Sequence, residues 1–402
     1  MKHTALIGGV LVTSILASTL AHAQSSVTFY GRIDNGIEYQ TGLPNGSRWA
    51  AQSGDHGQSW FGMQGSEDLG GGTAAIFQLE TGLNTQNGNF GNGSLFGRHA
   101  TIGLTNPAWG TFKTGNLGAG ELSEDSFLVD PQQMQKYAIS TLVRGRNWSQ
   151  TGNGFEYTSP RMGGLAIKGQ YDLANGTSWN TGNSGPTQLG SPPPGQPGSR
   201  QGRSDGLEVT YSLPGVDLIA LYDEIRDGNG KFSNVYLASR NFLAGGVFTF
   251  GAVKVYAGYQ HLSAPDASDA GVYGTAGVPT TLPAGTSLPT AVDHEWLGAA
   301  WQVTPAASLI AAVYHANANN GNGNATLSTV SATYNLSKRT FLYSAVGYLY
   351  NSSTSNIGLG NGYADPYGAN INDDPTTGKV GSFSPNYGQS QTGVFAGLMT
   401  AF

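Results

Sequence analysis

The chain has 402 residues, enough for one large all-β domain or two ordinary domains. Only 11% of its residues are charged and 38% are hydrophobic, and both shares are lower than in a typical soluble protein. It has no cysteine, which excludes disulfides and thiolate metal sites, and its net charge of −6 argues against binding to nucleic acid.

The first residues have the pattern of a removable export signal. Lys2 and His3 form a short positive region, residues 5–20 are apolar and small, and Ala21-His22-Ala23 fits the pattern that a signal peptidase reads. We therefore expect a signal peptide at 1–23 and a mature domain at 24–402. No other apolar run is long enough for a membrane helix, so insertion into a membrane requires strands that close into a barrel.

The first predicted strand, 27–39, alternates apolar and polar side chains with a period of two. It is longer than the ~9–11 residues that a tilted membrane strand needs. A half-exposed strand of a soluble sandwich would show the same alternation, so this segment alone does not decide the fold. Its polar face carries Thr28, Arg32, Asp34 and Glu38.

After this strand, tight turns alternate with long polar loops, and the last segment, Val394–Phe402, again alternates and ends on an aromatic residue. The alternation predicts about sixteen strands with the turns at one end and the loops at the other, which a soluble sandwich does not explain. The turns are 66–72, 106–110, 159–163, 213–215, 250–252, 304–306 and 336–339. The loops are 40–58, 81–97, 119–152, 173–204, 225–232, 263–293, 317–323 and 352–389.

Some features are specific to individual segments. The proline-rich stretch 191–198 cannot pair in a sheet and is expected at a loop tip. Strands after Ser233 are the hardest to assign, because around Arg240 both faces are partly apolar. Aromatic residues recur near strand ends, where membrane-interface girdles lie. They are Tyr30, Tyr39, Trp60, Tyr171, Tyr211, Tyr222 and Tyr259.

The sequence offers no pattern typical of catalysis or metal binding. The histidines of the mature chain are scattered, with no i, i+4 pair and no carboxylate at metal spacing. There is no Gly-x-Ser-x-Gly elbow, no phosphate-binding loop before a helix, and no evident Ser/His/acid group on one strand face. We therefore assign no catalytic residue, no metal and no cofactor.

Five segments, in their order along the chain, resemble the general diffusion porins of the Gram-negative outer membrane, β-proteobacterial type. The resemblance covers essentially the whole mature chain, and the terminal Phe402 completes it. It implies a sixteen-stranded barrel, a homotrimer in contact with outer-membrane lipid and lipopolysaccharide, and a third loop folded into the pore. The segments are Ser26–Asp34, Gly65–Gly72, Ala75–Glu80, Asn153–Pro160 and Val253–Tyr259.

By this resemblance the third loop is 119–152. Acids on an inward loop that face bases on the wall create a transverse field, which orients polar solutes and penalises apolar ones. From spacing alone, the loop charges would instead belong to an ordinary solvated loop. These charges are Glu121, Glu124, Asp125, Asp130, Arg144 and Arg146.

Strand alternation assigns further charges to the inner wall, where acids outnumber bases, so we predict a weak cation preference. The bases are Arg32, Lys113, Lys168 and Lys254. The acids are Asp34, Glu38, Glu80, Glu156, Asp172, Glu208 and Asp217. Relatives commonly carry basic residues where this chain has Trp60, Gln64, Asn116 and Glu156. An inward Trp60 would be able to stack on sugars or aromatic solutes, but we expect it in a girdle.

These observations predict a passive, water-filled channel for small hydrophilic solutes and ions. One alternative is a substrate-selective porin in which Trp60 and the third loop hold a particular solute. Another is an adhesin or structural barrel that acts through its long loops, above all 263–293 and 352–389.

Overall fold

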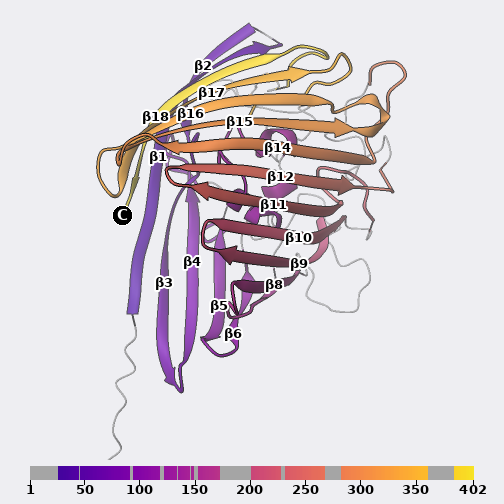
Figure 1. The fold of residues 1–402 in the computed structure, drawn as a ribbon. Helices are drawn as coiled ribbons and strands as arrows, with labels where there is room; N and C mark the ends of the chain where they lie inside the picture. The colour runs from indigo at the N-terminus through magenta and orange to yellow at the C-terminus, as the bar shows by residue number, and fades with distance from the viewer. Residues whose placement is uncertain are drawn as a thin grey trace, which may run out of the picture.

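The computed structural model describes residues 26–44, 46–90, 94–117, 122–133, 135–144, 146–148, 153–172, 201–227, 231–267, 282–360 and 384–402. The predicted signal peptide 1–23, Glu121 and the loop tip 191–198 lie outside these residues. The described part is mainly one antiparallel sheet whose strands wrap around an interior (Figure 1).

The strands follow one another around the sheet in chain order. The first half consists of β1 (Ser26–Leu43), β2 (Gly46–Ser53), β3 (Ser59–Gly70), β4 (Thr73–Leu83), β5 (His99–Asn106), β6 (Gly110–Asn116), β7 (Gly154–Thr158), β8 (Leu165–Asp172) and β9 (Gln201–Leu213). The second half consists of β10 (Val216–Asp227), β11 (Arg240–Phe250), β12 (Val253–Ser263), β14 (Ala291–Gln302), β15 (Ala307–Ala318), β16 (Ala325–Asn335), β17 (Thr340–Asn351) and β18 (Gln391–Ala401).

The sheet closes into a barrel because its first and last strands pair with each other. β1 and β18 run antiparallel from Arg32↔Ala401 to Gln40↔Gly393. The other edge of β1 pairs with β3 over its first part and with β2 over its last part, so β2 and β3 are two halves of one interrupted strand. The seventeen strands of the sheet therefore form a sixteen-stranded barrel, which confirms the predicted fold class.

The first connection differs from the prediction. A long loop was expected at 40–58, but β1 continues to Leu43, the chain turns at once, and β2 pairs back along β1. Only residues 54–58, between β2 and β3, leave the sheet. The apolar alternation fades there because several side chains of β2 are exposed polar or small residues. The sequence therefore has the composition of a loop although the backbone forms a hairpin.

The barrel exposes apolar side chains and buries charged ones, the reverse of a soluble protein. In β17, Leu342, Val346 and Tyr348 are exposed, whereas Tyr343 and Ala345 between them are buried. Acids such as Asp34 and Glu38 are buried on the inner face. This distribution is expected for strands that face lipid on one side and the barrel interior on the other. No helix among the described residues is long and apolar enough to span a membrane.

The two ends of the barrel also differ in their connections. The predicted turns are confirmed at the ends of β5, β7, β9, β11, β14 and β16, although β3 extends through most of the first one, to Gly70. Longer connections at the other end include 84–98, 264–290 and 352–390, parts of which lie outside the described residues. Except for the first hairpin, short turns at one end and long connections at the other agree with the turns and loops predicted from the sequence.

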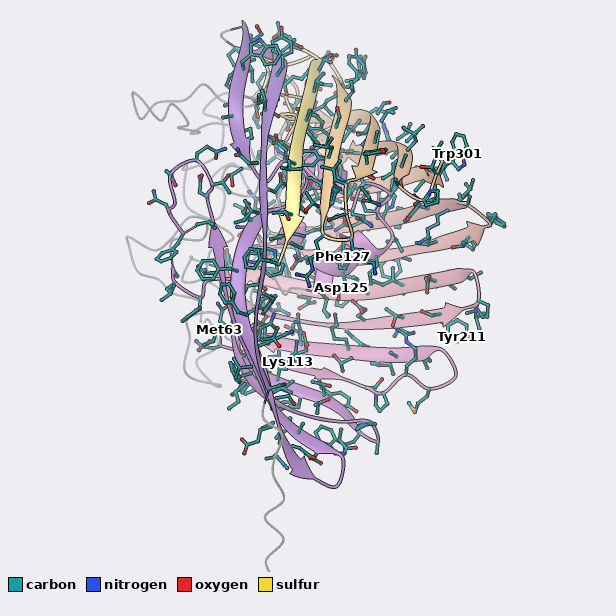
Figure 2. All side chains as sticks on the ribbon, turned by 90° about the vertical axis from the view of Figure 1, so that its left-hand side faces the viewer. Met63, Lys113, Asp125, Phe127, Tyr211 and Trp301 are labelled. Atoms are coloured by element: carbon teal, nitrogen blue, oxygen red, sulfur yellow. The ribbon has the colours of Figure 1, made fainter. Side chains whose placement is uncertain are left out.

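The aromatic residues predicted for the girdles divide into two groups. Tyr39, Tyr222 and Tyr259 lie on the outer face, and Figure 2 shows Tyr211 at the outer edge of the barrel. Tyr30 and Trp60 instead point inward, because both share the face of Arg32 and Asp34 in the register of β1 with β3. The girdle prediction for Trp60 was therefore wrong, whereas its assignment to the inner face by alternation was right.

The described parts of the third loop, 122–133, 135–144 and 146–148, fold into the barrel, as the resemblance implied. The loop contains the short helices η1 (Leu122–Leu128), α1 (Ile139–Leu142) and η2 (Arg146–Trp148). Its apolar residues Val129, Ile139 and Leu142 join one buried cluster with inward residues of β10–β18. The loop therefore packs against the inner face of these strands.

Candidate pore constriction

The third loop is held against the inner wall by hydrogen bonds to several strands. Tyr314 of β15 donates to the Asp130 carboxylate at 2.5 Å, and the Trp296 indole of β14 donates to the Val129 carbonyl at 2.8 Å. Thr329 of β16 donates to the Tyr137 carbonyl at 2.8 Å. Since these donors come from three neighbouring strands, the loop backbone is fixed across this part of the wall.

Small residues on the wall make room for the loop. Gly298 of β14 and Gly347 of β17 both face inward, and a Cβ atom at Gly298 would lie 2.6 Å from Pro131. A Cβ atom at Gly347 would lie 2.9 Å from the ring of Tyr137. Such distances are shorter than van der Waals contact, so a side chain at either position would clash with the loop.

The loop is also tied to β1, the strand that pairs with β18. Lys136 Nζ lies 2.7 Å from Glu38 and 3.1 Å from Asp55, and the Tyr137 hydroxyl donates to Glu38 at 2.7 Å. Burial alone would lower the pKa of Lys136, but the charges of Glu38 and Asp55 outweigh it and raise this pKa. Arg48 of β2 is 3.3 Å from the same Glu38 carboxylate. We refer to Glu38, Asp55, Lys136 and Tyr137 as the β1 clamp.

Three of the predicted constriction charges on the loop are fully buried. The Arg146 guanidinium lies 2.6 Å from the Asp223 carboxylate of β10 and donates to the Ser239 hydroxyl at 2.9 Å. The guanidinium of Arg144 lies over the Tyr236 ring at 5.1 Å from its centroid. Asp130 accepts from Tyr314, as described above. The expectation that Asp130, Arg144 and Arg146 line the passage is corrected, because these side chains anchor the loop and are not in contact with solvent.

Asp34 is likewise buried and holds a neighbouring segment of the wall in place. It accepts hydrogen bonds from the backbone N–H groups of His56 at 3.0 Å and Gly57 at 2.7 Å, and from the Tyr343 hydroxyl. These bonds fix residues 54–58, where the strand formed by β2 and β3 is interrupted. Asp34 therefore shapes the wall instead of presenting its charge to the interior.

The remaining predicted loop acids, Glu124 and Asp125, stay partly accessible. Asp125 pairs with Lys168 of β8, whose ammonium is also 3.9 Å from Glu208. Burial raises the pKa of Glu124 to about 8, although the nearby Arg98 charge partly opposes this shift. Figure 2 shows Asp125 and Phe127 well inside the barrel. Of the predicted loop acids in the described residues, these two thus remain in the passage.

The wall charges Lys113 of β6 and Glu156 of β7 lie next to each other in the register of the two strands. Their Nζ and Oε1 atoms are 2.7 Å apart, and Gln170 of β8 donates to the other Glu156 oxygen at 2.7 Å. The pair is inward-facing and partly buried. Its opposite charges largely neutralise each other locally.

Arg32, Trp60 and Arg98 form a cluster on the wall opposite the loop. The guanidinium carbon atoms of Arg32 and Arg98 lie 5.5 Å and 5.8 Å from the centre of the Trp60 ring, within the range of cation–π attraction. Arg98 pairs with Glu80 and Gln58, whereas Arg32 donates to the Gln58 carbonyl at 2.9 Å. We refer to these three residues as the Arg–Trp–Arg cluster.

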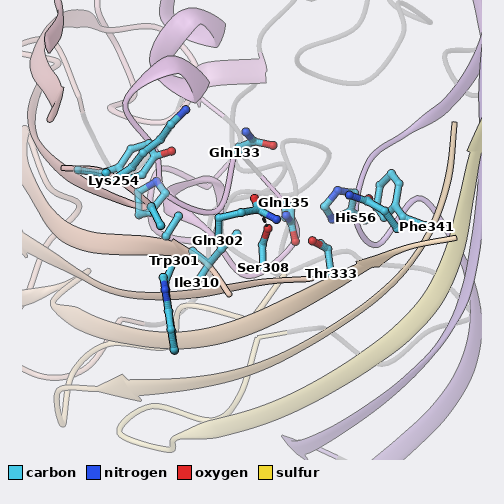
Figure 3. Close-up of a pocket in the computed structure, with 16 residues that line it drawn as sticks. His56, Gln133, Gln135, Lys254, Trp301, Gln302, Ser308, Ile310, Thr333 and Phe341 are labelled. Carbon is cyan, nitrogen blue, oxygen red and sulfur yellow. Dashed lines mark hydrogen bonds between the residues drawn. The ribbon is translucent and has the colours of Figure 1, made fainter. Parts of the chain in front are cut away.

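A cavity of about 750 Å³ separates this cluster from the third loop. Its lining includes Arg32, Trp60 and Arg98 on the wall side and Glu124, Phe127 and Lys136 on the loop side. A second cavity of about 380 Å³ shares His56, Gln133, Gln135 and Phe341 with it and extends to Lys254 and Gln302 near the turn end of β12 and β14 (Figure 3). Trp301, next to Gln302, points away from these polar residues, in agreement with its outward register.

Several residues of this site were not predicted from the sequence. Arg98 follows the predicted loop 81–97, and Asp55 was assigned to the loop 40–58. Lys136 lies in the third loop, where spacing alone does not distinguish a charge that faces the passage from one on a solvated loop. Asp217 was assigned to the inner face, and continuing the period of two along β10 places Asp223 on the same face. Among the described residues, no group of three or more His, Asp and Glu side chains is arranged to hold a metal ion.

Comparison with known proteins gives consistent matches. The sequence profile described as Gram-negative porin matches residues 9–354. An outer membrane porin protein of Bordetella pertussis is 38% identical over 29% of this chain and 33% of its own length. The chain thus matches about a third of that relative's length.

Solved structures match over almost the whole chain. The anion-selective porin from Comamonas acidovorans has a TM-score of 0.69 and 21% identity, covering 94% of this chain and 100% of that chain. The trimer form of OmpT from Vibrio cholerae has a TM-score of 0.58 and 14% identity, covering 94% and 99%. At these identities the likeness establishes the fold alone.

Proposed function

The chain belongs to the Gram-negative porin family, and we propose that it forms a passive, water-filled channel of the outer membrane for small hydrophilic solutes and ions. The observation that carries this proposal is the charged cavity of about 750 Å³ between the third loop and the wall of a closed, inside-out barrel. Passage by diffusion needs no catalytic group, and its selectivity depends on pore width and fixed charge.

We further propose that the solute-facing residues are those that remain accessible at the cavity or along the wall. They are Arg32, Lys113, Glu124, Asp125 and Lys168, together with Arg98. Glu156 is buried and contributes through its ion pair with Lys113. Glu121 remains a proposal from the sequence, because it lies outside the described residues. Glu38 contributes through the β1 clamp.

A weak cation preference stays a prediction. Among the described inward residues and the third loop, acids outnumber bases, which favours cations over the length of the passage. Close to the cavity, however, Lys136 and Arg98 are ion-paired with acids, and burial raises the pKa of Glu124 to about 8. The acids there therefore contribute less negative charge at neutral pH than their number indicates. The reversal potential in a salt gradient decides the sign, and a potential of the anion-selective sign contradicts the prediction.

The assembly and the processing of the chain are also proposals. A homotrimer is supported by the resemblance and by the likeness to OmpT in its trimer form. The exposed apolar outer face, which includes Phe29, Ile37 and Leu297, is suited to outer-membrane lipid and lipopolysaccharide or to neighbouring subunits. N-terminal sequencing of the exported protein should begin at Gln24 if residues 1–23 are removed.

Single-channel recording in a planar bilayer tests the function and the assembly together. A purified, folded protein should give large ohmic current steps in KCl, and closure in thirds would support the trimer. Folded barrels that give no current would contradict a channel and favour an adhesin or structural barrel.

A further inference from the structure

Aromatic side chains line the cavity, among them Trp60 on the wall side and Phe127 on the loop side. Phe127 of the third loop is 41% exposed and lines the cavity, whereas most exposed apolar residues of the barrel wall are on its outer face. Trp60 lies on the wall side of the same cavity and is half-buried. Contact between these rings and water is less favourable than contact with an apolar or aromatic surface, so the rings favour solutes that carry such a surface.

The charges around these rings are not equivalent. Lys136 is neutralised by Glu38 and Asp55, and Arg98 is bound by Glu80 and Gln58. Arg32 donates through Nε to the Gln58 carbonyl and has no carboxylate within ion-pair distance among the described residues. Its two terminal nitrogens are therefore the donors beside Trp60 that remain available to a carboxylate in the cavity.

The facing acid does not cancel this positive site at neutral pH. Glu124 is the acid of the cavity lining that lies on the third loop, and burial raises its pKa to about 8. It is therefore mainly protonated at pH 7 and can donate a hydrogen bond. The cavity volume of about 750 Å³ is within the range of ~300–1,000 Å³ typical of small-molecule sites.

We propose that this cavity binds small aromatic carboxylates during their passage, with the ring against Trp60 and Phe127 and the carboxylate on Arg32. The proposal rests on the proposed channel function and adds the class of solute. Aromatic contact and a charge-assisted hydrogen bond are both required, so neither a saturated carboxylate nor a neutral aromatic compound has the full set of contacts.

Block of single-channel KCl current at pH 7 tests the proposal with three probes: benzoate, cyclohexanecarboxylate and benzyl alcohol. Benzoate should reduce the current saturably and at concentrations roughly 2- to 10-fold lower than cyclohexanecarboxylate, the factor expected from one aromatic pair. Benzyl alcohol should have the weakest effect, because it lacks the charge that Arg32 would bind.

Three variants separate the contributions, and a fourth is the control. Trp60→Leu should remove the preference for benzoate over cyclohexanecarboxylate, whereas Trp60→Phe should keep part of it. Arg32→Gln should weaken block by both carboxylates. Trp301→Leu makes the same change on the outer face and should leave all three probes unaffected.

The outcomes for the site and for the channel are distinguishable. Normal KCl steps with equal block by benzoate and cyclohexanecarboxylate would overturn the aromatic site and leave the channel intact. The aromatic site is also overturned if Trp60→Leu conducts normally and keeps the preference. Absence of KCl steps from folded protein would instead overturn the proposed channel function itself.

Discussion

Tyr137 of the third loop donates a hydrogen bond to the carboxylate of Glu38 on β1, at 2.7 Å and across 99 residues of sequence. Both side chains are almost fully buried. The contacts of the loop with β10–β18 thus continue onto the neighbouring strand β1. This hydrogen bond therefore opposes movement of the loop away from β1.

Replacing Tyr137 by Phe keeps the ring and removes this hydrogen bond. A hydrogen bond to a charged group contributes about 1.5–3 kcal/mol, so the loop should detach from β1 more often. We expect more frequent closures and more open-channel noise in single-channel recordings. A quiet channel identical to the parent would show that Lys136 alone holds the clamp.

Tyr343→Phe is the matched control for this experiment. The Tyr343 hydroxyl also donates to a buried carboxylate of β1, that of Asp34, but both partners belong to the wall. Its loss should lower the stability of the barrel without a comparable increase in channel noise.

Gly347→Ala tests whether the close fit between the wall and the third loop is needed. The new Cβ would lie 2.9 Å from the ring of Tyr137, which must move. Overpacking of this kind costs about 1–3 kcal/mol, so the variant should unfold at a lower urea concentration in detergent micelles and should alter the conductance. Gly169→Ala, where the nearest atoms are 3.9 Å away, is the control and should change neither property.

Glu124 should make ion selectivity depend on pH. Its pKa is raised to about 8 by burial, so it is mainly neutral below pH 8 and becomes negative above it. The permeability ratio of cations to anions, obtained from reversal potentials, should therefore rise between pH 7 and 9. Glu124→Gln should abolish this rise, and Glu67→Gln, at the exposed end of β3, should not.

A second, smaller change is expected at lower pH. Burial raises the pKa of Asp55 to about 6, so this acid loses its charge as the pH falls through 6. Lys136 then has only Glu38 as a charged partner. A selectivity step near pH 6 should persist in Glu124→Gln, which distinguishes the two acids.

The fold was largely predictable because a membrane barrel imposes its period on the sequence. Alternation placed Arg32, Lys113 and Glu156 on the inner face, and the register of the strands agrees with all three. Alternation was weak after Ser233 for a reason that only the structure provides. The third loop covers the inner face of β10–β18, so inward residues such as Leu243 and Leu327 are apolar as well.

The site was less predictable because the sequence does not reveal which charges are paired. Arg146 and Glu124 are both charged residues of one loop, yet Arg146 is buried against Asp223 whereas Glu124 faces the cavity. The difference depends on how the loop folds onto strands far away in sequence. Counting acids and bases therefore predicts the sign of the total charge but not the charge that a solute meets.

The Arg146–Asp223 pair offers a final test of the anchoring role assigned to Arg146. Both groups are buried, and the Asn241 amide also donates to Asp223 at 2.5 Å. Arg146→Met should lower the free energy of unfolding by about 3–5 kcal/mol, because it leaves the Asp223 carboxylate buried without its counter-charge. Urea titration of the folded barrel in detergent micelles measures this loss.

The double variant Arg146→Met/Asp223→Leu decides between anchoring and solute contact. If the pair serves only to hold the loop, removing both charges should restore most of the lost stability and leave the selectivity of the channel unchanged. If Arg146 acted on passing ions, the double variant would regain stability but keep a shifted reversal potential. Because its guanidinium is fully enclosed by Asp223, Ser239 and Ser123, we expect the first result.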